Sequence, residues 1–152
     1  MLAPLDYKDL LRTLNRHKAK YLIIGAYAVA YYAEPRYTKD LDVWVDPEIE
    51  NAKRVYTALK EFGAPLRGIS FKDFTRRTLV YQIGVEPVRV DIIMGVAGID
   101  FSMAWKHRRI IKLDNSKVNI IGINELIDSK KKANRRTDLV DLANLRRKQK
   151  AR

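Results

Sequence analysis

The sequence predicts an α+β domain in which a mixed β-sheet is flanked by helices and followed by C-terminal helices. Strand-like and helix-like segments are interspersed along the chain, which favours one mixed sheet. Two pairs of strand-like segments are joined by turn sequences typical of hairpins. The 152 residues are 47% hydrophobic and 32% charged, a globular composition. We expect one domain over residues 1–152, with a core over about 20–122 and a helical part over about 123–148.

The first half of the chain alternates helices and strands. Leucines at helical spacing, an apolar run that stops at Gly25 and a later period-two segment indicate its elements. In order, we expect a helix over 5–18, a strand over 21–24, a helix over 26–33, a strand over 41–45 and a helix ending near 62. Asp46 is expected to cap the last of these helices, with Pro47 in its first turn and Gly63 at its end.

The second half adds two hairpins and the C-terminal helices. In order, we expect a helical turn over 71–74, strands over 78–83 and 88–93 joined by a turn at 84–87, a short helix over 100–105, and strands over 109–113 and 117–121. Asn124 is a candidate cap for a helix that begins at Glu125, and a last helix is expected from about Thr137. The basic tail from Arg146 is expected to fray.

The chain carries a large excess of basic residues. Thirty Lys and Arg stand against eighteen Asp and Glu, which gives a net charge of +12. This excess favours a polyanionic partner, either nucleic acid or a nucleoside triphosphate, although basic residues also keep a protein in solution. The absence of cysteine excludes disulfides, thiolate zinc sites and Cys nucleophiles. No signal peptide and no membrane span are predicted, so we expect a cytoplasmic protein without a membrane partner.

Asp40 and Asp42 are two residues apart on one expected strand, so their side chains share a face. Leu41 and Val43 then point to the opposite face, into the core. Two carboxylates held side by side repel each other unless a cation lies between them, and hard oxygen ligands of this kind suit Mg²⁺. The simpler interpretation is that the two acids end the strand or pair with nearby Lys or Arg.

Asp91 is a further carboxylate that lies on the polar face of a later expected strand. Val88, Val90 and Ile92 form one face of that strand, and Asp91 faces the other way, flanked by Arg89. If the two strands are neighbours in the sheet, the third acid meets the first two. Three acids can hold two metal ions about 3.5–4 Å apart, the geometry that stabilises the attacking and leaving oxygens of phosphoryl displacement.

Gly25 closes one expected strand and opens a helix. A glycine at this corner lets the backbone approach a phosphate closely, and the helix N-terminus supplies free N–H groups. The stretch from 27 to 39 is long enough to form a short helix and return the acids to this turn. A plain corner between strand and helix is the alternative interpretation.

Together, these residues resemble the nucleotidyltransferase superfamily that is built on the DNA polymerase β-type fold. Its motif is a Gly-Gly or Gly-Ser turn, a spacer, Asp-x-Asp and a later single Asp on a strand. The corresponding residues here are Gly25-Ala26, Asp40-Leu41-Asp42 and Asp91. The segment 35–42, PRYTKDLD, resembles the AbiEii/AbiGii-type branch, which includes toxins of toxin–antitoxin systems. Ala26 departs from the usual Gly or Ser, which leaves backbone N–H groups to contact phosphate there.

A second block, over residues 124–142, resembles the Leu-Ile-x-x-Lys and Arg-x-x-Asp-x-x-Asp-Leu pattern of the same branch. The matching positions are Lys130, Arg135, Asp138 and Asp141. The resemblance therefore covers roughly residues 20–145. Larger toxin relatives carry an added C-terminal region for which we expect no counterpart in these 152 residues, so the acceptor is left open.

The resemblance implies in-line attack of an acceptor hydroxyl on the α-phosphate of an NTP, with loss of pyrophosphate. It implies that Asp40, Asp42 and Asp91 are catalytic and bind Mg²⁺ or Mn²⁺ as cofactor. The candidate nucleotide-binding residues are Gly25, Ala26, Arg36, Thr38, Lys39, Lys130 and Arg135. Asp138 and Asp141 share a helix face and are candidates to support the site. An exposed charged face and a favourable helix-dipole interaction stay open as structural explanations of these C-terminal charges.

The leading hypothesis is a nucleotidyltransferase that modifies tRNA or another RNA, with an antitoxin protein as a candidate partner. From Glu125 onward, ten basic residues stand against four acidic ones, so the C-terminal helices are the expected contact surface. Two alternatives stay open. One is an antibiotic-type nucleotidyltransferase that acts on a small molecule, and the other is a non-catalytic or antitoxin-like module of the same fold. The oligomeric state is not predicted.

Overall fold

The computed structural model describes residues 5–33, 40–85, 88–133 and 135–151. A six-stranded mixed sheet forms its centre, with strand order β3-β4-β2-β1-β6-β5. The first elements are α1 (Leu5–Arg16), β1 (Tyr21–Ile24), α2 (Gly25–Tyr32), β2 (Asp40–Val45), α3 (Ile49–Phe62) and the 3-10 helix η1 (Phe71–Thr75). The remaining elements are β3 (Val80–Val85), β4 (Val88–Ile93), α4 (Phe101–Lys106), β5 (Arg109–Leu113), β6 (Ser116–Ile120), α5 (Ile123–Ala133) and α6 (Arg136–Lys150). The predicted α+β class is therefore confirmed.

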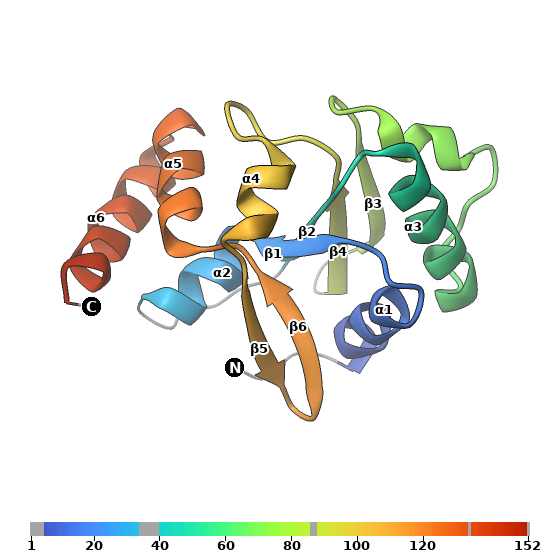
Figure 1. Ribbon diagram of the computed structural model, residues 1–152, viewed down its shortest axis with the longest axis horizontal. Coiled ribbons are helices and arrows are strands. Elements are labelled where there is room, and N and C mark those ends of the chain that lie inside the picture. Colours follow the sequence, from blue (N-terminus) through green and yellow to red (C-terminus); the bar gives the residue numbers. More distant parts are fainter. Residues whose placement is uncertain (1–4, 34–39, 86–87, 134, 152) are drawn as a thin grey trace.

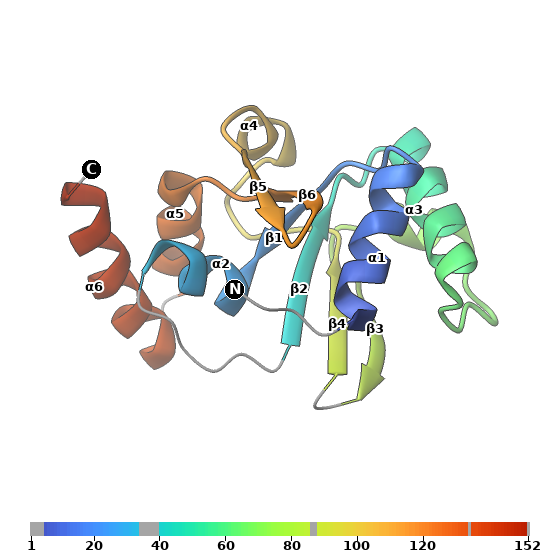
Figure 2. The same ribbon diagram turned by 90° about the horizontal axis from the view of Figure 1, so that it is seen from below.

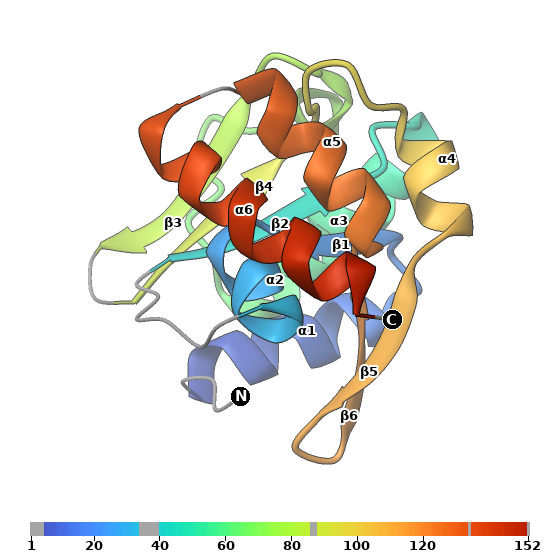
Figure 3. The ribbon, with the colours of Figure 1, turned by 90° about the vertical axis from the view of Figure 1, so that its left-hand side faces the viewer.

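Helices flank the sheet in two groups. Figure 1 shows α1 and α3 together on one side of the molecule and α5 and α6 together on the other. Turned to face its left-hand side, the molecule has α5 and α6 in front of the sheet and α1 and α3 behind it (Figure 3). From below, α6 and α3 lie at opposite ends of the molecule (Figure 2). The C-terminal helices thus lie on the opposite side of the sheet from α1 and α3, and α5 and α6 both contact α2.

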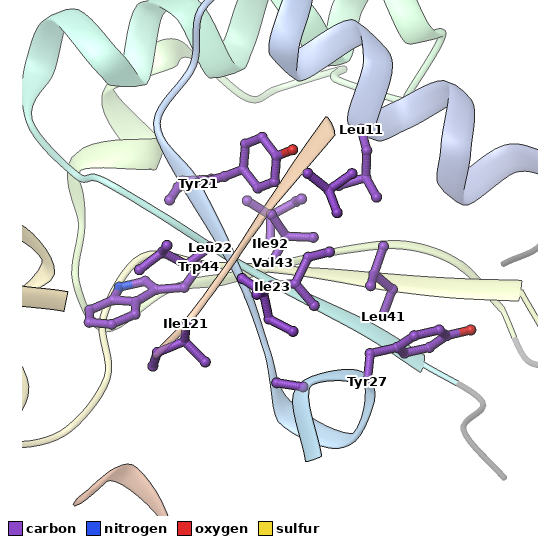
Figure 4. Packing of buried hydrophobic residues seen from close by; sticks show 14 of the residues in the cluster. Leu11, Tyr21, Leu22, Ile23, Tyr27, Leu41, Val43, Trp44, Ile92 and Ile121 are labelled. Carbon is purple, nitrogen blue, oxygen red and sulfur yellow. The ribbon is translucent and has the colours of Figure 1, made fainter. Parts of the chain in front are cut away.

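The core follows from the alternation of the strands. In β2, Leu41 and Val43 are buried, whereas the two aspartates beside them are half-buried. In β4, Val90 and Ile92 are buried in the same way, and they belong to the same apolar cluster. Figure 4 shows Leu41, Val43 and Ile92 among the buried side chains packed around the central strands. Burial of one face of β2 and β4 fixes the register, because a slip by one residue would place carboxylates in the core.

The start of α3 differs from the prediction. The helix begins at Ile49, and its N-cap is Glu48, whose carboxylate accepts from the backbone N–H of Glu50 at 3.1 Å and of Asn51 at 3.2 Å. The expected cap at Asp46 and the first-turn place of Pro47 are wrong. Asp46 instead accepts from the backbone N–H of Glu48 at 3.1 Å, before the helix begins. Gly63 ends the helix in the left-handed conformation as predicted, with φ 96°.

The first strand of the first hairpin lies two residues later than predicted, because β3 covers Val80–Val85 and the predicted strand covered 78–83. The ladder of β3 and β4 continues through the pairs Gly84–Arg89 and Val85–Val88, so Gly84 is a strand residue and not part of the turn. Its positive φ of 76° is tolerated because glycine lacks a Cβ. Of the predicted turn at 84–87, residues 86–87 lie outside the described part of the chain.

The C-terminal helices are also longer than predicted. Helix α5 begins at Ile123, one residue before the expected cap Asn124, and α6 continues to Lys150 through the tail that was expected to fray. Leu142 and Leu145 of α6 are buried, which anchors this helix against its neighbours. None of the described helices is long and apolar enough to cross a membrane.

Candidate active site

Two adjacent strands bring three aspartates together. Strand β2 pairs in parallel with β4, and in this register Asp42 lies opposite Asp91. Asp40 precedes Asp42 by two residues, so all three side chains project from the same face of the sheet. The two strands are neighbours, which was the condition for the acids to meet.

Gly25 lies directly beneath one of these acids. It adopts φ 70°, a conformation that other residues rarely take, at the junction of β1 and α2. A Cβ at this position would lie 2.3 Å from Oδ2 of Asp42, so the carboxylate occupies the space that a side chain would need. Neighbouring Ala26 lies in the first turn of α2, where no side chain caps the helix. The backbone N–H groups of this turn are therefore donors beside the acids.

Burial and mutual repulsion raise the pKa of Asp42 to about 6. Desolvation is the largest cause, followed by the charges of Asp91 and then Asp40. Oδ1 of Asp40 is buried and has no hydrogen-bond partner among the residues that the structure describes. The group is rich in oxygen, one buried acceptor has no partner among the described residues, and the positive charges of Lys130 and Arg89 offset the repulsion between the acids only in part. Such a group fits a hard divalent cation such as Mg²⁺.

An arginine lies among the acids. Arg89 Nη2 is 3.0 Å from Oδ2 of Asp91, its Nε is 3.2 Å from Oδ1 of the same carboxylate, and Nη2 is 3.6 Å from Oδ2 of Asp40. With the side chains in these positions, no three acidic or imidazole groups among the described residues gather as a metal-binding cluster. The strand register therefore brings the predicted acids together, and one of them is held by an internal cation.

Helices α5 and α6 contribute a buried ionic cluster. Lys130 is 8% exposed, and its Nζ lies 3.1 Å from Oδ1 of Asp138 and 3.3 Å from Oδ2 of Asp141. Arg135 Nε lies 2.8 Å from Oδ2 of Asp138. Lys130 lowers the pKa of Asp42 by its charge, although burial and the other acids outweigh it. The segment 124–142 therefore folds close enough to the three aspartates for Lys130 and Arg135 to interact with Asp42 through their charges. Lys130 is paired with both Asp138 and Asp141, and Arg135 is paired with Asp138.

Two residues beside the acids were not among the predicted site residues, and some predicted site residues lie outside the described part of the chain. Arg89 shares the face of Asp91 by its spacing, so its place beside the acids was available from strand periodicity. Gln82 on β3 lies opposite Asp91, which only the register reveals. The candidate phosphate contacts Arg36, Thr38 and Lys39 lie outside the described residues.

Comparison of the sequence with protein-family profiles and with curated proteins gave no match. Solved structures do match along the chain. A candidate nucleotidyltransferase from Thermotoga maritima is 16% identical with a TM-score of 0.59, covering 100% of this chain and 97% of the other. The lincosamide antibiotic adenylyltransferase LnuA, solved with lincomycin bound, is 13% identical with a TM-score of 0.61, covering 95% and 97%. A nucleotidyltransferase-like antigenic protein from Paracoccidioides brasiliensis is 17% identical with a TM-score of 0.55, covering 94% and 78%.

The fold is therefore the nucleotidyltransferase fold, as the resemblance predicted. At these identities the likeness concerns the fold, and the chemistry has to be argued from the site itself.

Proposed function

We propose that this protein transfers a nucleoside monophosphate from an NTP to an acceptor hydroxyl. The observation that carries the proposal is the register that aligns Asp42 with Asp91 on one sheet face, directly above the Gly25 corner. A structural role for these acids accounts poorly for the buried Oδ1 of Asp40, which has no hydrogen-bond partner in the described part of the chain, and for the pKa of Asp42, which is raised to about 6.

Asp40, Asp42 and Asp91 would hold Mg²⁺, or Mn²⁺, which when bound supplies positive charge at the reacting phosphate oxygens. The N-terminus of α2 would contact the triphosphate through the N–H groups at Gly25 and Ala26. The acceptor oxygen forms a bond to the α-phosphorus while the bond to the bridging oxygen breaks and pyrophosphate leaves. The acceptor's proton passes to Asp91 or to water.

We propose an RNA as the acceptor, with the 3′ end of tRNA as the first candidate, as expected of a toxin of the AbiEii-type branch. The support is electrostatic. Exposed basic side chains on α5 and α6 lie on the side of the sheet that includes α2: Lys131, Lys132, Arg135, Arg136, Arg146, Arg147, Lys148 and Lys150. A surface of this charge attracts a phosphate backbone.

The test is incubation of the full chain with each α-³²P-labelled NTP, Mg²⁺ and total RNA, beside Asp42→Asn and the exposed control Asp128→Asn. We expect label in RNA with the wild type and the control, and none with Asp42→Asn. Absence of both Mg²⁺-dependent NTP binding and label transfer would contradict the proposal and support a non-catalytic, antitoxin-like module.

A small-molecule acceptor is the second candidate, favoured by a cavity and by the likeness to LnuA. A cavity of about 580 Å³ lies at the C-terminal ends of β2 and β4, bordered by Trp44 and by α4. It contains none of the three aspartates, but Trp44 follows Asp42 by two residues on β2. The charged side chains that line it are Asp46, Glu48, Asp100 and Arg77, a net negative set that suits a cationic acceptor. The test adds a polyol that carries amino groups, because it offers both hydroxyls and positive charge. Label in this compound, and not in RNA, would favour a small-molecule acceptor.

A further inference from the structure

Arg89 forms a bidentate contact with Asp91, the third of the predicted catalytic acids. Its Nε and Nη2 donate to the two oxygens of Asp91 at 3.2 Å and 3.0 Å. Such bidentate pairs are among the stronger charge-assisted hydrogen bonds in proteins. The side chain of Asp91 is 13% exposed and that of Arg89 is 30% exposed, so solvent screens the pair only in part. Asp91 is therefore held by a cation before any metal ion reaches it.

The sheet holds Arg89 in this position from both sides. On the β2 side, Arg89 lies opposite Asp40, and Nη2 of Arg89 is 3.6 Å from Oδ2 of Asp40. On β3, Gln82 accepts from Arg89 Nε at 3.0 Å and Nη2 at 3.1 Å when its amide takes the orientation that satisfies both ends. Tyr7 fixes the backbone, since its hydroxyl donates to the carbonyl of Arg89 at 2.9 Å and accepts from its N–H at 3.2 Å. The backbone is anchored, so any rearrangement is confined to the side chain.

The guanidinium and a metal ion compete for the same carboxylates. A metal ion that binds Asp91 must displace the bidentate contact of Arg89. The guanidinium then stays close to the metal ion, and the two positive charges repel each other. A triphosphate removes both obstacles, because its oxygens offer the guanidinium an equally bidentate partner. A metal ion alone brings no such partner for Arg89.

We propose that Arg89 couples the metal occupancy of Asp91 to the binding of a nucleoside triphosphate. Without nucleotide, Arg89 keeps Asp91 engaged and a divalent ion binds through Asp40 and Asp42. With nucleotide, the guanidinium moves to the phosphates and Asp91 becomes a metal ligand. This inference rests on the proposed function, and linkage requires that the metal ion strengthen nucleotide binding by the same factor.

The test counts and titrates bound Mn²⁺ by electron paramagnetic resonance on the full chain, with and without α,β-methylene-ATP. Four proteins are compared: wild type, Asp91→Asn, Arg89→Gln and the double variant. Without nucleotide, we expect Asp91→Asn to change the Mn²⁺ affinity of the wild type by less than about threefold. In the Arg89→Gln background, the same change should weaken Mn²⁺ binding about tenfold or more. With the nucleotide analogue, the wild type should show this larger effect as well.

Equal effects of Asp91→Asn in the nucleotide-free wild type and in Arg89→Gln would overturn the coupling. Arg67→Gln makes the same charge change at an exposed position and should leave Mn²⁺ binding unaltered. Asp42→Asn separates the two hypotheses. If it leaves Mn²⁺ binding unchanged in every background, the metal site is wrong, and the proposed function fails together with this inference. If it abolishes binding while Arg89→Gln has no effect, only the inference fails.

Discussion

The α-carbon of Gly25 lies against the carboxylate of Asp42, so close that a Cβ would come within 2.3 Å of Oδ2. Gly25, at the corner of β1 and α2, is thus in close contact with Asp42 on β2. Because the carboxylate fills the place of a missing side chain, Asp42 lies directly against the first residue of α2. This contact leaves no room for a side chain at residue 25, so the corner requires glycine.

Gly25→Ala is expected to lower the free energy of unfolding and to weaken Mn²⁺ binding. The left-handed φ costs an alanine about 1–2 kcal/mol, and the overlap with the carboxylate adds about 1–3 kcal/mol. Gly68 is a matched control, since its φ is 78° and a Cβ there meets nothing within 4 Å. Urea unfolding and Mn²⁺ titration of both variants give the comparison. Equal losses in the two variants would show that the contact with Asp42 contributes nothing.

Asp42→Asn is expected to stabilise the metal-free protein while it abolishes transfer. Burial first, and then the neighbouring acids, raise the pKa of this carboxyl from 3.8 to about 6. The stability that protonated Asp42 contributes is full below about pH 3.8 and is lost as the pH rises through about 6. At pH 7.5 the neutral amide should therefore raise the free energy of unfolding by about 1–3 kcal/mol in EDTA.

Thermal unfolding at pH 7.5, with EDTA or with Mg²⁺, measures this effect. Mg²⁺ should raise the Tm of the wild type and leave that of Asp42→Asn unchanged, because binding to the folded state stabilises it. A variant less stable than the wild type in EDTA would contradict the assigned repulsion. Asp128→Asn, on the exposed face of α5, controls for the loss of one negative charge.

Asp138→Asn is expected to reduce the pH dependence of the free energy of unfolding at acidic pH. Burial opposes ionisation of Asp138, but hydrogen bonds from Arg135 and Lys130 outweigh it and lower its pKa to about 2. The resulting stability is present above about pH 3.8 and is lost as the pH falls through about 2. The variant should lose about 2–3 kcal/mol at pH 7, with a flatter stability profile between pH 4 and 2. Urea titrations across this range measure it, and a profile parallel to the wild type would count against the cluster.

Neutralising the basic surface of α5 and α6 is expected to reduce the labelling of RNA. It should also make the affinity for RNA less dependent on salt concentration. The variant replaces five exposed residues with Gln: Lys131, Lys132, Arg146, Arg147 and Lys148. Each lost phosphate contact should reduce the slope of log affinity against log salt by about 0.7 for single-stranded RNA. The KM for NTP should stay unchanged, because these residues lie outside the acid cluster.

Substitution of Arg109, Lys112 and Lys117 on the exposed hairpin of β5 and β6 provides the control for that variant. It removes positive charge from a region that projects away from α5 and α6 (Figure 1). An equal loss of labelling in the hairpin variant would point to non-specific attraction and against a contact surface on the C-terminal helices.

Much of this architecture follows from local patterns. The period-two segments placed β2 and β4, and Gly63 ended α3 where expected. Errors cluster where two local solutions compete. Asp46 is the preferred cap by residue type, yet Glu48 is the residue that precedes α3 and caps it. The tail after Arg146 reads as unanchored, yet Leu142 and Leu145 tie α6 to the rest of the molecule.

The sequence by itself determined the alternation of the strands, the face on which the acids lie and the glycine corner, because these depend on spacing along the chain. Only the tertiary structure decided that β2 and β4 pair in parallel with Asp42 opposite Asp91, and that Arg89 also lies beside Asp40 of the neighbouring strand. It also decided that Lys130 is buried against Asp138 and Asp141. The pairing of β2 with β4 joins segments far apart in sequence and is fixed by the burial of shared apolar faces. The contacts of Lys130 depend on how α5 packs against α6, which spacing along the chain does not encode.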